Sequence, residues 1–321
     1  MSAFVEVVAP GLLTTIQDLG RWGHQTLGVP VAGPMDPFAH RLANALVSNT
    51  REAATLEVTL TGPTLVFHDA RSCAVTGADF DFFIDDERVP LCARVDVRAG
   101  GVLRFGDRNS GARAYLAIGG GFDVPLTLGS RATHLPSGMG GWQGRALRRG
   151  DCLPLGPPRS FADRSGNDRD FSARTAASGA SVPRASVVRV LAGPQDDRFS
   201  ADALEVLTAR EYILDTSSNR MGYRLIGSSI THRAGADIIS DATPLGSVQV
   251  PASGQPVLLM ADRQTTGGYA KIATVISADI GIAGQAAPGD PLLFERCTHA
   301  EALAALVARE RPLLALESRC A

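Results

Sequence analysis

The sequence predicts a mainly β protein built from two related β-rich halves with a few short helices. Glycine and proline are frequent, with 34 and 19 copies in a chain of 321 residues. Short apolar runs such as 56–60 and 187–191 recur between Gly, Pro and Asp residues, which is typical of short strands joined by tight turns. Three turn motifs also occur twice in the same order, as expected for a duplicated unit.

A helical pattern is confined to the segments 36–47, 200–209 and 300–309. Each begins near an Asp, Ser or Thr, whose side-chain oxygen can accept hydrogen bonds from the first N–H groups of a helix. Asp36 closely follows Gly33 and Pro34 at the start of the first segment. We therefore expect Asp36 to cap this helix, and Gly33 and Pro34 to form the turn that leads into it.

The three repeated motifs place one copy in each half. They are Gly-Pro-X-Asp, Asp-Arg followed by an amide residue, and Gly-Asp followed two residues later by Leu; their copies begin at Gly33 and Gly193, at Asp107 and Asp262, and at Gly150 and Gly289. Residues 157–186 are rich in Ser, Ala, Arg and Asp and lack periodic apolar positions, which favours an exposed linker. The predicted organisation is an N-terminal half at 1–156, a linker at 157–186 and a C-terminal barrel half at 187–321.

Charge and cysteine content argue against several classes of protein. A net charge of -2 gives no attraction for nucleic acid or for an anionic membrane. No apolar stretch approaches the length of a membrane span and no secretory leader is evident, so we expect a cytoplasmic protein. Five cysteines without metal-binding spacing fit reduced thiols, and the six histidines form no metal motif. We expect no metal.

The motifs of several common enzymes are missing from the sequence. There is no Walker-type phosphate loop, no dinucleotide fingerprint and no nucleophile elbow. Lys271 also lacks the flanking methionines of a biotin acceptor. We therefore expect that any ATP is gripped largely by partner chains, and that biotin is not attached to this chain.

Lys271 is the only lysine, because every other basic residue of the 31 is arginine. An ammonium acts as a point charge and can lose its proton when desolvated, which a guanidinium does not do. Lys271 ends the densest polar run of the sequence, in which glycines allow a ligand to approach the backbone closely. The candidate residues of this run are Asp262, Arg263, Gln264, Thr266, Gly267, Gly268, Tyr269 and Lys271.

Further candidate binding residues lie outside this run. Arg21 follows a polar turn, and Asn219 with Arg220 could grip a carboxylate or a carbamoyl group. An equally good interpretation of the Asn219–Arg220 pair is a simple turn, with the asparagine in the left-handed region and the arginine in solvent. Gln249 alternates with valines, so as a strand residue it is expected to face solvent.

The segments 14–21, 33–37, 218–223 and 262–269 resemble the family of the 5-oxoprolinase C subunit, also called KipA-like or allophanate hydrolase subunit 2. The resemblance covers nearly the whole chain outside the linker. It implies a cyclophilin-like β-barrel fold, relationship to half of the carboxyltransferase domain of urea carboxylase, and a KipI-like B subunit as partner. It also implies that the A, B and C subunits together open 5-oxo-L-proline to L-glutamate with ATP, and that this chain is inactive alone.

The small-molecule substrates of these relatives share an N–H beside a carbonyl, which suits a hydrogen-bond acceptor paired with a cation. The resemblance therefore favours Asp262, Tyr269 and Lys271 as catalytic residues. It favours Arg21, Asn219, Arg220, Gln249, Arg263, Gln264 and Thr266 as substrate-binding residues. Two other functions remain open: the carboxyltransferase half of a urea carboxylase or allophanate-type system, and a regulatory antagonist of a kinase inhibitor.

Overall fold

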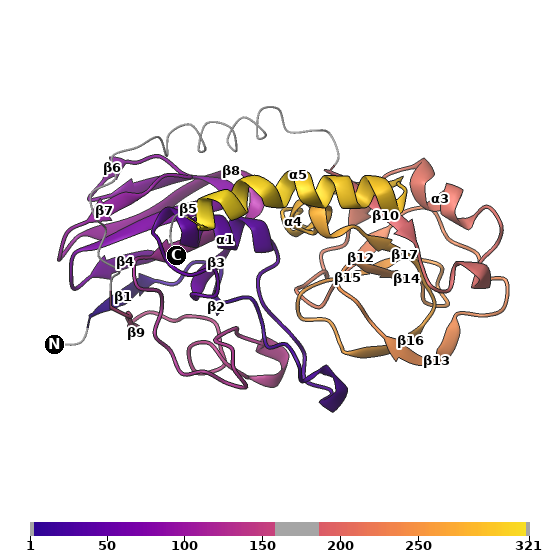
Figure 1. The fold of residues 1–321 in the computed structure, drawn as a ribbon, viewed down its shortest axis with the longest axis horizontal. Helices are drawn as coiled ribbons and strands as arrows, with labels where there is room; N and C mark the ends of the chain where they lie inside the picture. Colours follow the sequence, from indigo (N-terminus) through magenta and orange to yellow (C-terminus); the bar gives the residue numbers. More distant parts are fainter. Residues whose placement is uncertain (1–2, 158–185, 319–321) are drawn as a thin grey trace. The chain divides into compact units, whose positions relative to one another are not determined.

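A computed structural model describes residues 3–157 and 186–318, which form two compact units (Figure 1). The described part of the first unit contains residues 3–21, 32–157 and 312–318, and that of the second contains 22–31 and 186–311. The predicted linker lies almost wholly outside the described residues. The prediction of a mainly β protein with a β-barrel is confirmed.

The first unit is organised around a nine-stranded sheet. Six strands follow the order β2-β3-β8-β4-β1-β9, and the long strand β5 pairs with β6, β7 and β8. Alternating apolar residues such as Val5, Val7 and Leu65 place the core on one face. The strands are β1 (Phe4–Ala9), β2 (Leu13–Gln17), β3 (Thr55–Thr59), β4 (Thr64–Phe67), β5 (Arg71–Ile84), β6 (Glu87–Arg88), β7 (Val95–Val97), β8 (Val102–Ile118) and β9 (Cys152–Pro154).

Helix α1 (Pro37–Leu46) packs on β5 and β8 and forms a second apolar cluster there. Asp36 caps it as predicted, because its side chain accepts a hydrogen bond from the N–H of Ala39. Pro37 takes the first helical position, where its missing N–H costs nothing.

The second unit is a closed barrel of seven strands in the order β10-β17-β14-β15-β12-β11-β18. Inward residues such as Val190, Val248 and Leu258 are fully buried and fill it. The barrel strands are β10 (Ser186–Ala192), β11 (Tyr212–Leu214), β12 (Gly222–Ile226), β14 (Ser247–Gln249), β15 (Val257–Leu259), β17 (Lys271–Val275) and β18 (Pro291–Arg296).

A two-stranded ribbon stands beside the barrel and is formed by β13 (Asp237–Ala242) and β16 (Thr266–Tyr269). Five of the six residues of β13 are exposed, and Ile239 is 94% exposed. An isolated two-stranded ribbon is only marginally stable in water, so side-chain contacts to the barrel decide whether it is ordered.

The other helices of the second unit differ from the sequence prediction at their ends. Helix α3 (Ala203–Ala209) begins three residues later than expected, and the short α4 (Ile280–Gly284) was not predicted. Helix α5 (His299–Glu317) runs eight residues beyond its expected end and contains Pro312. Its last turns are stabilised within the first unit, where Leu313 is fully buried and Glu317 forms a bidentate ion pair with Arg41. None of the helices in 3–157 and 186–318 is long and apolar enough to cross a membrane.

One of the three repeated motifs has the same geometry in both units. Gly150 and Gly289 have φ values of 85° and 91°, and each donates its N–H to a strand carbonyl, of Val7 and of Leu214, at 2.8 Å. The other two motifs occupy different structural positions. In the second motif, Asp107 lies within β8, whereas Asp262 lies in a buried turn.

Candidate functional site

The polar run 262–271 folds as a turn that begins at the buried Asp262, followed by strand β16 and the first residue of β17. Strand β16 leaves the barrel to pair with β13, and β17 returns to the barrel beside β14. This path brings Gln249 opposite Lys271 across a local irregularity of the β14–β17 ladder. The polar run and Gln249 therefore lie together where the ribbon meets the barrel.

Lys271 connects the ribbon to the barrel. Its side chain is 1% exposed, and its Nζ donates to Oδ2 of Asp241 at 2.8 Å. Gln195 donates to the same carboxylate at 3.2 Å, and its own side-chain oxygen accepts from the N–H of Lys271. The hydrogen bond from Lys271 is the main cause that lowers the pKa of Asp241 below its usual value. The sole lysine thus has an acid partner at the half-exposed rim of the ribbon.

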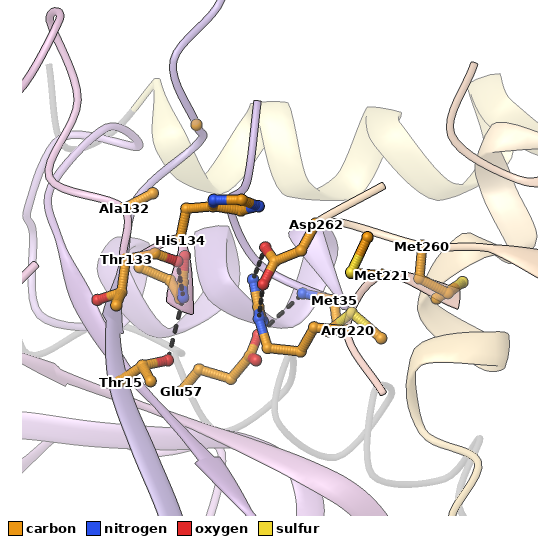
Figure 2. Close-up of polar contacts among 12 residues, drawn as sticks. Thr15, Met35, Glu57, Ala132, Thr133, His134, Arg220, Met221, Met260 and Asp262 are labelled. Atoms are coloured by element: carbon orange, nitrogen blue, oxygen red, sulfur yellow. Dashed lines mark hydrogen bonds and ion pairs between the residues drawn. The ribbon is translucent and has the colours of Figure 1, made fainter. Parts of the chain in front are cut away.

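Arg220 and Asp262 form a buried ion pair (Figure 2). Nε and Nη2 of Arg220 donate to the two oxygens of Asp262 at 3.0 and 2.9 Å, and the N–H of Asp262 donates to the carbonyl of Arg220 at 2.8 Å. The arginine is therefore not in solvent. Asn219 is exposed and has no positive φ, and its side-chain oxygen accepts from the N–H of Met221. The turn directs Arg220 inward while Asn219 stabilises it locally.

Gln249 is 2% exposed, so the expectation that it faces solvent is wrong. Strand β16 covers it: its Nε2 donates to the carbonyl of Tyr269 at 3.4 Å. A Cβ added to Gly267 would lie 2.7 Å from that Nε2, whereas one added to Gly268 would meet nothing closer than 3.6 Å. Thr266 and Tyr269 have exposed side chains on the ribbon. Gly267 is therefore the glycine that this contact requires.

Arg263 lines a pocket of about 230 Å³ in the second unit. Its Nε donates to the carbonyl of Thr243 at 2.7 Å, and Nη1 lies 3.5 Å from the carbonyl of Met260. Burial lowers the pKa of Arg263 to about 10, because the charged form is desolvated. The pocket is lined by Trp22, Gln25, Val31, Ala242, Thr243, Pro244, Arg263, Gln264 and Thr265.

The remaining predicted residues lie in the first unit, where they hold loops together. Arg21 is 1% exposed and donates to the carbonyls of Thr127 and Ala132. Gly33 has a φ of 91° and packs against the backbone of residues 18–20, which leaves little room for a side chain. Pro34 is buried in the same turn, which ends at the cap residue Asp36.

Sequence reasoning missed three polar residues that complete these arrangements. Glu57 is 1% exposed and accepts from the N–H of Met35 at 2.8 Å (Figure 2). It also accepts from the hydroxyl of Tyr115 at 2.8 Å. A glutamate between Leu56 and Val58 in an apolar strand was the available signal. For Gln195, the available signal was its position within the repeated motif that begins at Gly193. Nothing in the sequence around Asp241 indicated its contact with Lys271, because only the pairing of β13 with β16 brings the two residues together.

The sequence pattern of the family "Carboxyltransferase domain, subdomain A and B" matches residues 27–296 of this chain. The chain belongs to this family. Two relatives within it are named as the C subunit of 5-oxoprolinase. The protein of Haemophilus influenzae is 38% identical, over 90% of this chain and 89% of its own length. The protein of Escherichia coli is 36% identical, over 96% of each chain. The resemblance inferred from the motifs is thus confirmed.

A solved structure of the family has the same fold. The urea amidolyase of K. lactis superposes with a TM-score of 0.89 at 30% identity, over 98% of this chain. The matched region is only 20% of that chain. The barrel, the ribbon and the nine-stranded sheet are therefore shared with a region inside a much larger protein.

Proposed function

We propose that this chain is the C subunit of an ATP-dependent 5-oxoprolinase complex that opens 5-oxo-L-proline to L-glutamate. The observation that carries the proposal is the end-to-end match to two proteins named as 5-oxoprolinase C subunits, which extends over 89% and 96% of those proteins. A chain that matches a subunit over nearly all of that subunit's length is expected to have the same function as the subunit. We propose a KipI-like B subunit and an A subunit as its partners.

The chemistry of the second unit supports a lactam substrate. Arg263 and Gln264 place a cation and a carboxamide on one pocket wall. The carboxamide of Gln264 can donate a hydrogen bond to the lactam oxygen, where negative charge grows when water attacks the carbonyl carbon. The ion pairs of Arg220 and Lys271 hold the turn and the ribbon that frame this wall.

The catalytic roles of Asp262, Tyr269 and Lys271 stay predictions. Both oxygens of Asp262 accept from Arg220, which favours a role in holding the turn. Tyr269 is 42% exposed and can meet a partner chain or a substrate. ATP would be held largely by the partner chains.

A carboxyltransferase function is the second candidate, favoured by the superposition on urea amidolyase over 98% of this chain. In that case a carboxyl group would pass from carboxybiotin on another chain to an N–H of urea or a related amide. The shared feature of both functions is an N–H beside a carbonyl in the substrate.

Reconstitution separates the two functions. The chain would be purified with its KipI-like partner and with the A subunit, and glutamate release from 5-oxoproline would be measured with and without ATP. We expect release only when all three chains and ATP are present. A full rate without this chain, or no release from the complete complex, would contradict the proposal. Urea-dependent consumption of carboxybiotin by the chain and its partner would instead support carboxyl transfer.

A further inference from the structure

We propose that the pocket beside Arg263 is a receptor for a small carboxylate, with the Arg263 guanidinium as its counter-charge. The pocket lies within the second unit and is formed by the segment 22–31, the end of the ribbon at 242–244 and the turn 263–265. This inference extends the lactam binding proposed above by assigning a carboxylate of the ligand to Arg263.

Arg263 differs from the other two predicted cations of the second unit. Arg220 is bound to Asp262 through two hydrogen bonds, and Lys271 is bound to Asp241. Within residues 3–157 and 186–318, the hydrogen bonds of the Arg263 side chain go only to two backbone carbonyls. A guanidinium has five N–H donors, so three of them are unused by these bonds.

Arg263 is partly buried, which makes an anionic partner favourable. A desolvated charge without a counter-charge is destabilising, and the lowered pKa of Arg263 reflects that cost. The two carbonyls fix the guanidinium in place, so little side-chain entropy is lost when a ligand binds. Binding of an anion in the pocket would therefore offset the unfavourable desolvation free energy of the Arg263 charge.

The walls of the pocket select the kind of anion. The lining residues include no Asp or Glu, and among them are Gln25, Gln264 and Thr265 together with Trp22. A volume of about 230 Å³ lies below the usual range of sites for drug-sized ligands, roughly 300–1,000 Å³. The planar fork of an arginine matches the two oxygens of a carboxylate. The carboxamides of Gln25 and Gln264 can form hydrogen bonds with an amide group of the same small ligand.

Direct binding to the full chain tests the proposal. Trp22 and Trp142 are the two tryptophans of the sequence, so Trp142→Phe leaves the emission of Trp22 as the reporter. The probes are 5-oxoproline, which has a carboxylate and a lactam, 2-pyrrolidinone, which has only the lactam, and inorganic phosphate. We expect saturable binding of 5-oxoproline and binding of 2-pyrrolidinone weaker by about 10- to 100-fold, the range of a lost charged hydrogen bond.

Two substitutions locate the receptor. Arg263→Gln is expected to weaken 5-oxoproline binding by a similar factor, about 10- to 100-fold, and Arg263→Lys to weaken it less. Arg224→Gln removes an exposed arginine of the same unit and is the matched control. If Arg263→Gln does not fold, the comparison of 5-oxoproline with 2-pyrrolidinone still tests whether the pocket recognises a carboxylate, because it needs no substitution at Arg263.

Equal binding of 5-oxoproline and 2-pyrrolidinone, tighter binding of phosphate, unchanged binding in Arg263→Gln, or no binding at all would each overturn the proposal. The proposal rests on the proposed function only for the choice of 5-oxoproline as a probe. Because binding is measured without ATP or partners, its outcome is separate from turnover. An active complex whose chain shows no binding overturns the receptor alone, and binding in an inactive complex overturns the proposed enzyme function alone.

Discussion

Replacing Asp262 with asparagine should destabilise the second unit strongly. Asp262 is 1% exposed, and each of its oxygens accepts one hydrogen bond from Arg220. Asparagine keeps the size of the side chain but removes the carboxylate charge that faces the buried guanidinium of Arg220. Breaking a buried pair in this way costs about 3–5 kcal/mol. For a unit of this size such a loss lowers the melting temperature by about 6–20 °C.

Urea unfolding, monitored by Trp22 emission in a Trp142→Phe background, measures this loss because Trp22 belongs to the second unit. Asp237→Asn changes an exposed acid on the ribbon and should shift the midpoint little. Replacing both partners, Arg220→Met with Asp262→Leu, should recover part of the lost stability, because neither member of this pair is then left as a buried charge facing a neutral partner. A cost below about 1 kcal/mol, the range of an exposed ion pair, would refute the argument that burial makes this pair structurally essential.

Three further predictions concern other parts of the chain. Gly267→Ala should reduce activity of the complex because its Cβ displaces Gln249, whereas Gly268→Ala should not; equal effects would contradict this. Lys271→Met should speed amide hydrogen exchange in 237–242, because the ribbon loses its ion pair; unchanged exchange would remove that role. Burial lowers the pKa of His40 from 6.5 to about 4, so the folded state binds fewer protons in this window. Unfolding free energy should therefore fall by about 3 kcal/mol as pH drops from 7 to 4, and His40→Gln should remove that part of the decrease; identical pH curves would contradict it.

Sequence reasoning worked where local chemistry sets the structure. Asp36 could be assigned as a helix cap because capping depends on a few neighbouring residues. The alternation of short apolar runs and turns was enough for a mainly β fold. Helix α5 extends further than its pattern suggested, because packing of Leu313 and the ion pair of Glu317 are contacts with distant residues.

The candidate site shows the division between sequence and tertiary structure most clearly. Composition and residue order alone establish that Lys271 is the only lysine and that it ends a dense polar run. Which of the cations pair with acidic side chains depends on the folded structure. Pairing of β13 with β16 brings Asp241 to Lys271, and the buried turn brings Asp262 to Arg220. These partners lie 30 and 42 residues away along the chain, and such contacts depend on how strands associate and not on local sequence preference.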